Sequence, residues 1–134
     1  LSSSSAASDV YKRQGSTYTG GTESNTGYSS AGDAGDIVQV AFDADNGKIY
    51  FGVNGTWQGS ADPAAGTNYA YSSLDTSLFY FPCASTGSDV EGNFGSPSYS
   101  ISSSNTDGNG YGNMEFAVPS GYYVLNSKNL AEYG

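Results

Sequence analysis

The chain has 134 residues and a net charge of −9, from 13 acidic and 4 basic side chains. That length is enough for one domain with a real hydrophobic core, and the acidic balance disfavours binding to nucleic acid or to anionic membranes. Because these residues include no histidine and a single cysteine, Cys83, they exclude an intrachain disulfide, a Cys/His zinc site, a Ser-His-Asp triad and a Cys-His pair.

The first segment, residues 1–14 (LSSSSAASDVYKRQ), differs in composition from the rest of the chain and holds half of the basic side chains. It resembles a translated sequencing-adapter artefact, so we expect a non-native or disordered leader there. A natural flexible linker is the alternative. Residues 15–34 are polar and glycine-rich, and Tyr18 and Tyr28 mark two short expected strands.

The clearest pattern in the chain covers residues 35–57. Apolar residues alternate on one face of each of two segments: Val38, Val40 and Phe42 in the first, and Ile49, Phe51 and Val53 in the second. Strict alternation predicts half-buried strands. The DADNG sequence at residues 43–47 predicts a hairpin turn between them, and an Asn-Gly corner follows the second strand.

Two polar loops resemble calcium-binding loops without matching the full ligand pattern. Counted from Asp43, the fifth residue of the loop, which supplies a ligand in an EF-hand, is Gly47, so a turn is favoured there over a metal site. Residues 105–110 (NTDGNG) come closer, but Glu115 is then the eleventh residue instead of the twelfth. We expect no metal and no cofactor, and a loose Ca²⁺ site at residues 105–110 stays open as the alternative.

The rest of the chain contains long polar loops and several expected strands. Loop 58–77 precedes the apolar run 78–85 (LFYFPCAS), which we expect to be a central strand in which Cys83 is buried. No window shows apolar residues at helical spacing, so we expect little helix. Residues 127–134 would begin a truncated continuation of the chain. The further expected strands cover residues 89–95, 99–102, 114–118 and 121–126, with a second long loop at residues 97–113.

In order and spacing, these segments resemble the SPRY domain family. The matching motifs are a G-D entry, an Asp and a Gly around a turn, an I-x-F strand, an N-G corner, an F-P strand and an N-F-G close. The residues that match are Gly35, Asp36, Asp43, Gly47, Ile49, Phe51, Asn54, Gly55, Phe81, Pro82, Asn93, Phe94 and Gly95. The resemblance implies an all-β fold, an antiparallel β-sandwich of the concanavalin A-like, jelly-roll type over residues 15–126, incomplete at both ends. In that fold the matching residues are structural.

The same resemblance implies loops at one end that bind other proteins, and no catalysis. We therefore expect a non-catalytic module that binds another protein or a host-surface glycan through its end loops. The net charge of −9 disfavours a nucleic-acid or membrane partner. Residues 54–68 and 121–130 also look like SPRY segments of structural proteins from bacterial viruses. Trp57, Tyr69 and Tyr71 around loop 58–77 are candidate binding residues. Alternatively, they fold back onto the core.

Two other functions stay open. One is a purely structural sandwich in an assembly, and the other is a carbohydrate-binding or carbohydrate-active domain. A retaining glycosidase needs two facing carboxyl groups. Glu91 and Glu115 are isolated in the sequence, so we expect no catalytic residues.

Overall fold

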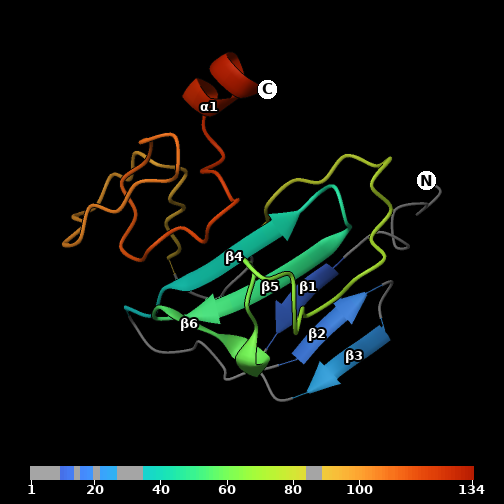
Figure 1. Cartoon of the computed structure of the whole chain (residues 1–134). Helices are drawn as coiled ribbons and strands as arrows, with labels where there is room; N and C mark the ends of the chain where they lie inside the picture. The colour runs from blue at the N-terminus through green and yellow to red at the C-terminus, as the bar shows by residue number, and fades with distance from the viewer. Residues whose placement is uncertain (1–9, 14–15, 20–21, 27–34, 84–88) are drawn as a thin grey trace, which may run out of the picture. The chain divides into compact units, whose positions relative to one another are not determined.

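The computed structural model describes residues 10–13, 16–19, 22–26, 35–83 and 89–134 (Figure 1). The chain divides into two compact units, Leu1–Leu78 and Phe79–Gly134. Regular structure in the described residues is mostly antiparallel strand with one seven-residue α-helix, which fits the expected all-β class and the expected low helix content. No helix in this part of the chain is long and apolar enough to cross a membrane.

The first sheet has three antiparallel strands in the order β1-β2-β3. A bulge interrupts the pairing of β2 with β3 between Thr17 and Tyr18. The strand expected at Tyr18 is therefore present, whereas Tyr28 lies outside the described residues. β1 falls within the expected leader, and it pairs with β2. The bounds are Val10–Arg13 for β1, Ser16–Thr19 for β2 and Thr22–Thr26 for β3.

The second sheet confirms the hairpin that the sequence predicts. It runs in the order β4-β5-β6, all antiparallel, and β6 leads directly into the short 3-10 helix η2. In the register, Val40 is opposite Phe51, so the alternating apolar residues of β4 and β5 lie on one face of the sheet. The bounds are Val38–Asp43 for β4, Lys48–Val53 for β5, Thr56–Trp57 for β6 and Gln58–Ser60 for η2.

Gly47 closes the hairpin turn because no other residue fits there. Its φ is +62°, and a Cβ at this position would lie 2.5 Å from the backbone oxygen of Leu74. The next corner, Asn54-Gly55, has φ values of +49° and +83°. Two successive positive φ values are those of a type I′ hairpin turn, which explains the Asn-Gly sequence.

Burial in this sheet centres on β5 and differs from the expected half-buried pattern. Four residues of β5 in a row, Tyr50 to Val53, are buried, because β5 is the middle strand and both of its faces are covered. Val38 and Val40, which were expected to face the core, are 50% and 57% exposed, while Ala41 on the opposite face is buried. Two β5 residues pack with loop 58–77 in one cluster of Ile49, Phe51 and Ala70.

The prediction of a strand at residues 78–85 is wrong for the part that the structure describes, residues 78–83. None of these residues belongs to a strand, and Phe79 and Phe81 are exposed instead of central. Cys83 is also exposed, where a buried thiol was expected. Apolar and aromatic composition indicates a preference for a pleated surface, but a ladder partner decides whether a strand forms.

The predictions of strands after residue 88 are also wrong. Glycines and local hydrogen bonds replace ladders: Gly95 has φ +99°, and the Tyr122 N–H donates to the Pro119 C=O at 3.0 Å in a turn. Val90 and Phe94, the large apolar residues of the expected strand at residues 89–95, are exposed. The segments concerned are residues 89–95, 99–102, 114–118 and 121–126, of which only Met114 makes a bridge, to Asn105.

The α-helix of the described residues, α1 (Ser127–Tyr133), covers most of the expected C-terminal continuation. Asn126 is its N-cap, and the Asn126 side-chain oxygen accepts a hydrogen bond from the Asn129 N–H at 2.8 Å. This is the usual way in which asparagine satisfies a free N–H in the first turn of a helix.

Candidate functional site

The G-D entry and the N-G corner, which flank the hairpin, meet at one corner, which we call the Asn54 corner (residues 35–37 and 54–55). The Asn54 Nδ2 donates to Asp36 Oδ1 at 2.8 Å, and Asn54 Oδ1 accepts from the Ile37 N–H at 2.9 Å. The Gly55 N–H donates to Gln39 Oε1 at 2.7 Å. The G-D entry and the N-G corner are therefore joined by side-chain hydrogen bonds, and both have a structural use.

The acidic hairpin turn is closed by its own hydrogen bonds. Asp43 Oδ1 accepts from the Asn46 N–H at 3.0 Å, and the Asn46 Nδ2 donates to both carboxylate oxygens, at 3.1 and 2.9 Å. Burial alone would raise the pKa of Asp43, but the hydrogen bonds from Asn46 and the charge of Lys48 hold that pKa below its ordinary value. This side chain acts as a turn former, as expected for residues 43–47.

Loop 58–77 is fixed to the hairpin along β5. The Ile49 N–H donates to the Tyr71 C=O at 3.0 Å, which extends the sheet at the edge where β6 ends. The Leu74 N–H donates to the Gly47 C=O at 3.0 Å. The end of the loop is thus held at two points of the hairpin, so its conformation is set by the sheet.

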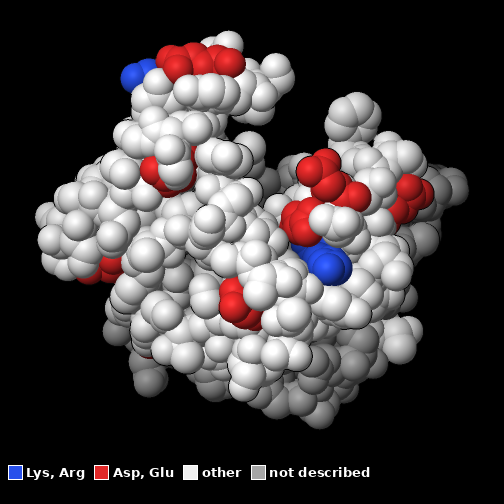
Figure 2. All heavy atoms as spheres, in the orientation of Figure 1, with Lys and Arg blue, Asp and Glu red and all other residues white. Residues whose placement is uncertain are grey.

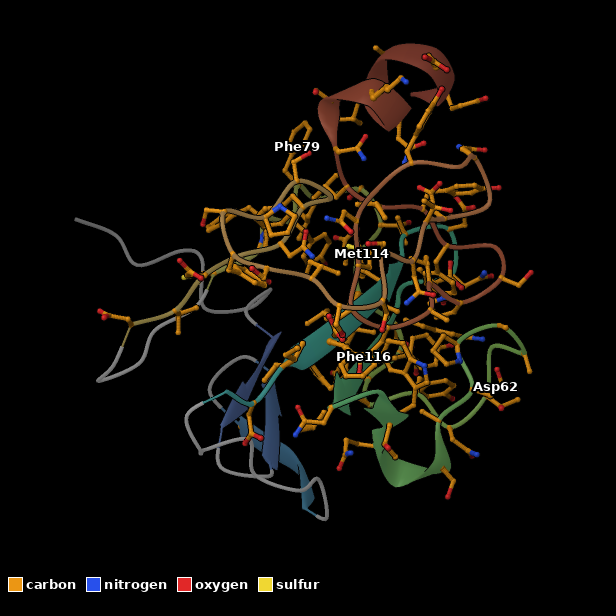
Figure 3. All side chains as sticks on the ribbon, turned by 90° about the vertical axis from the view of Figure 1, so that its left-hand side faces the viewer. Asp62, Phe79, Met114 and Phe116 are labelled. Atoms are coloured by element: carbon orange, nitrogen blue, oxygen red, sulfur yellow. The ribbon has the colours of Figure 1, made fainter. Side chains whose placement is uncertain are left out.

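The middle of loop 58–77 is a tight turn built on Asp62. Asp62 and Thr67 exchange two backbone hydrogen bonds of 3.1 Å, and Asp62 Oδ1 accepts from the Ala65 N–H at 3.0 Å. Asp62 is labelled in Figure 3. The turn brings the Gly66 C=O to Lys48 Nζ, which donates to it at 3.0 Å.

Lys48 also lies beside one of the three candidate aromatic residues. Its Nζ is 5.4 Å from the centre of the Tyr69 ring, within the range of a cation–π contact. The ring is 43% exposed, so one part of Tyr69 contacts the lysine and another faces solvent. Sequence reasoning missed Lys48, because no motif marks a lysine at a strand start as a partner of an aromatic residue in a later loop.

The other two candidates contact β5 at different points. A Cβ added at Gly52 would lie 3.2 Å from a carbon of the Trp57 ring, so this half-buried ring lies against the Gly52 backbone. Tyr71 is half-buried and belongs to the backbone bridge with Ile49. Of the three candidate residues, Tyr69 is the one that is exposed.

The remaining motif residues lie in the unit Phe79–Gly134. Asn93 makes two hydrogen bonds: Nδ2 donates to the Asn113 C=O at 2.9 Å, and Oδ1 accepts from the Gly95 N–H at 2.8 Å. Gly95 is buried, and a Cβ there would lie 3.0 Å from Val124. The other three residues of these motifs, Phe81, Pro82 and Phe94, are exposed.

Asp107 is the centre of the second unit, and it lies in the loop that was considered for calcium. It is 7% exposed, and its carboxylate accepts four N–H hydrogen bonds. The donors are Asn109 and Tyr111 to Oδ1, both at 3.0 Å, and Val124 and the Asn129 side chain to Oδ2, at 2.9 and 2.6 Å. Burial alone would raise the pKa of Asp107, but these hydrogen bonds hold that pKa below its ordinary value.

The contacts of Asp107 connect loop 105–113 to α1. Asn109 Nδ2 donates to Asn129 Oδ1 at 2.9 Å, and Lys128 Nζ lies 4.1 Å from the centre of the Tyr111 ring. The Tyr111 hydroxyl donates to Glu132 at 2.6 Å, and this hydrogen bond raises the pKa of Tyr111 to about 12. Nothing in the sequence marked Asn129 as the partner of Asp107.

The isolated glutamates have local partners. Glu115 accepts hydrogen bonds from the Ser102 N–H at 2.8 Å and from the Ser102 and Ser103 hydroxyls. The hydrogen bonds from Ser102 lower the pKa of Glu115 below its ordinary value. Glu91 accepts from the Ser98 hydroxyl at 3.4 Å. Among the described residues, no three His, Cys, Asp or Glu side chains gather as a group of metal ligands.

Comparison of the chain with models of protein families, with curated proteins and with solved structures finds no match. A function for the chain is therefore inferred from its own structure, namely from the hairpin and loop 58–77.

Proposed function

We propose that this chain is a non-catalytic binding module of the SPRY type. Its ligand is a protein or a host-surface glycan, and its setting is a structural protein of a bacterial virus. The observation that carries the proposal is loop 58–77, which is fixed to β5 and leaves the Tyr69 ring 43% exposed. Loops held on a rigid sheet are the places where binding residues concentrate.

Support for the SPRY type comes from the Asn54 corner. Asp36 and Asn54 are 18 residues apart in the sequence, and they match two separate motifs of the family. Their direct hydrogen bond gives a physical reason why both motifs would occur together at this spacing. A chance match of short motifs would have no reason to place their side chains in contact.

Support for a β-sandwich comes from the apolar face of β4. Val38 and Val40 are 50% and 57% exposed on the face that they share with Phe51. A second sheet packed on this face would remove both side chains from water, as sheets in a sandwich do for one another. In this proposal, β4, β5 and β6 belong to one of the two sheets.

Tyr69 offers two kinds of contact to a ligand. Its ring can stack on the C–H face of a sugar or on an apolar side chain, and its hydroxyl can donate or accept a hydrogen bond. Tyrosine also loses little conformational entropy when it binds, since it has few rotatable bonds. Lys48 beside the ring limits its movement, which further reduces the entropy lost.

A glycan array and a pull-down from host-cell surfaces, both with the full chain, test the proposal. We expect binding that Tyr69→Ala weakens and that Tyr123→Ala, a matched removal of an exposed tyrosine in the other unit, leaves unchanged. A folded chain that binds nothing in either assay would overturn the proposal. Near-ultraviolet circular dichroism establishes that each protein is folded.

One observation favours a second function, a structural sandwich without a separate ligand. The Trp57 ring lies against Gly52, and the Tyr71 backbone forms the bridge to Ile49, so these two candidates have structural roles. If the binding assays fail with folded protein, this structural function replaces the first.

A further inference from the structure

Residues 78–83 (LFYFPC) form an exposed apolar run. Phe79 is fully exposed and projects from the ribbon in Figure 3, Phe81 is 81% exposed, and Leu78 is 44% exposed. Aromatic residues in this number are rarely left in water by a soluble protein, and a contiguous exposed group of them marks an interaction site. None of the three candidate binding residues belongs to this run.

The run also lies in a stretch of sequence without charge. Residues 76–88 contain no Asp, Glu, Lys or Arg, although the chain as a whole carries −9. Acidic side chains are spread over the face seen in Figure 2. Asp75 borders the stretch, and its Oδ1 accepts from the Ser77 N–H at 3.0 Å and from the Ser77 hydroxyl at 2.6 Å. This carboxylate is therefore already engaged within its own chain.

We infer that residues 78–83 are a self-association surface, and that their partner is the same segment of a second copy in a closed two-fold dimer. Two molecules of charge −9 repel one another, and most contacts between them would bring carboxylates together. Contact through residues 78–83, which carry no charged side chain, avoids this repulsion. A basic partner is less well matched, because the run itself offers no carboxylate for its lysines or arginines.

The spacing of the two phenylalanines allows such pairing. Phe79 and Phe81 are two residues apart, so an extended backbone places both rings on one side. A two-fold axis makes the contact self-complementary, and it closes at the dimer. The inference does not rest on the proposed function, since oligomeric state is measured without a ligand.

Sedimentation velocity tests the inference on the full chain with the single change Cys83→Ser, so that no disulfide forms between copies. We expect a monomer–dimer equilibrium over about 10 µM to about 1 mM protein. The dimer should become stronger as NaCl is raised from about 0.05 to about 0.5 M, because salt screens the repulsion between the acidic surfaces. Contacts that depended on ion pairs would weaken instead.

Two double variants in this background locate the surface. Phe79→Ser with Phe81→Ser should weaken the dimer at least about tenfold. Leu125→Ser with Leu130→Ser, which also removes two exposed apolar side chains, should leave it unchanged. A monomer at every concentration and salt, growth beyond the dimer, or equal association of the Phe variant and its parent would each overturn the inference. Circular dichroism establishes that both variants are folded.

Discussion

Replacement of Asn54 tests the corner that joins the two motifs of the hairpin. Asn54 does two things there: its side chain bonds Asp36 and the Ile37 N–H, and its backbone takes a φ of +49°. Asn54→Gly removes the side-chain bonds and keeps the backbone conformation. Asn54→Ala removes the bonds and leaves at this positive φ a side chain that, unlike asparagine, has no polar group to favour the left-handed region. The pair of variants therefore separates the two contributions.

The magnitudes follow from these contacts. Each side-chain hydrogen bond lies at an exposed corner and contributes about 0.5 kcal/mol, at the low end of the usual range, so Asn54→Gly should cost about 1 kcal/mol. An alanine at positive φ costs about 1 kcal/mol more. Asn54→Ala should therefore lower the free energy of unfolding by about 2 kcal/mol.

The assay is urea unfolding followed by the fluorescence of Trp57. It is the single tryptophan of the chain, and β6 places it directly after the corner. The midpoint and slope of each transition give the free energy of unfolding of the hairpin unit. An Asn54→Gly variant as stable as the parent would show that the side-chain bonds contribute nothing. Equal loss in the two variants would refute the backbone term.

Three further predictions follow from the structure. Gly47→Ala should destabilise the hairpin by about 2–3 kcal/mol, because the new Cβ meets the Leu74 backbone oxygen. Gly110→Ala, which has a similar φ but open space around it, should cost about 1 kcal/mol. Urea unfolding measures the first cost, and hydrogen exchange measures the second. Asp107→Asn should expose the amides of α1 to faster hydrogen exchange, and unchanged exchange would contradict the assigned role. The pKa of Asp107 in the folded chain lies below its ordinary 3.8, so the stabilisation that its carboxylate contributes should be complete above pH 3.8 and should disappear as the pH falls through the lower, folded-state pKa. In a pH titration, the protection of the α1 amides from exchange should therefore fall in the parent below pH 3.8, and the Asp107→Asn variant should lack this step. Lys48→Met should increase proteolysis within loop 58–77, since the bond to Gly66 and the contact with Tyr69 are both lost, and an unchanged cleavage rate would argue against this anchor.

The hairpin was predictable because every local signal agrees there. Alternation predicts the strands β4 and β5, and Asn-Gly sequences predict both turns. The burial of its residues was not predictable in the same way. Whether Val38 faces the core depends on what packs against β4, and the alternation contains no information about that partner.

The second unit was mispredicted because its residues look like strands by composition alone. Phe79, Phe81 and Val90 have high strand propensity, but their segments find no ladder in the described structure. Asp107 and Asn129 organise this unit instead, through hydrogen bonds between residues that are 22 positions apart. A contact of that range leaves no periodic signal in a single sequence.

Within the candidate site, the sequence indicated the loop and its aromatic residues but not their roles. The cluster of Trp57, Tyr69 and Tyr71 around loop 58–77 is visible in the sequence. Their different roles depend on neighbours that meet only in the folded chain: Trp57 lies against Gly52, Tyr71 bridges Ile49 through its backbone, and Tyr69 lies beside Lys48.

The central claim is that loop 58–77 on the β5 hairpin is a binding surface, and an affinity measurement tests it most directly. The ligand found by array or pull-down is titrated against the parent chain, Tyr69→Ala and Tyr123→Ala. We predict that Tyr69→Ala raises Kd at least about tenfold and that Tyr123→Ala leaves Kd unchanged. Equal Kd values for all three proteins would contradict the claim.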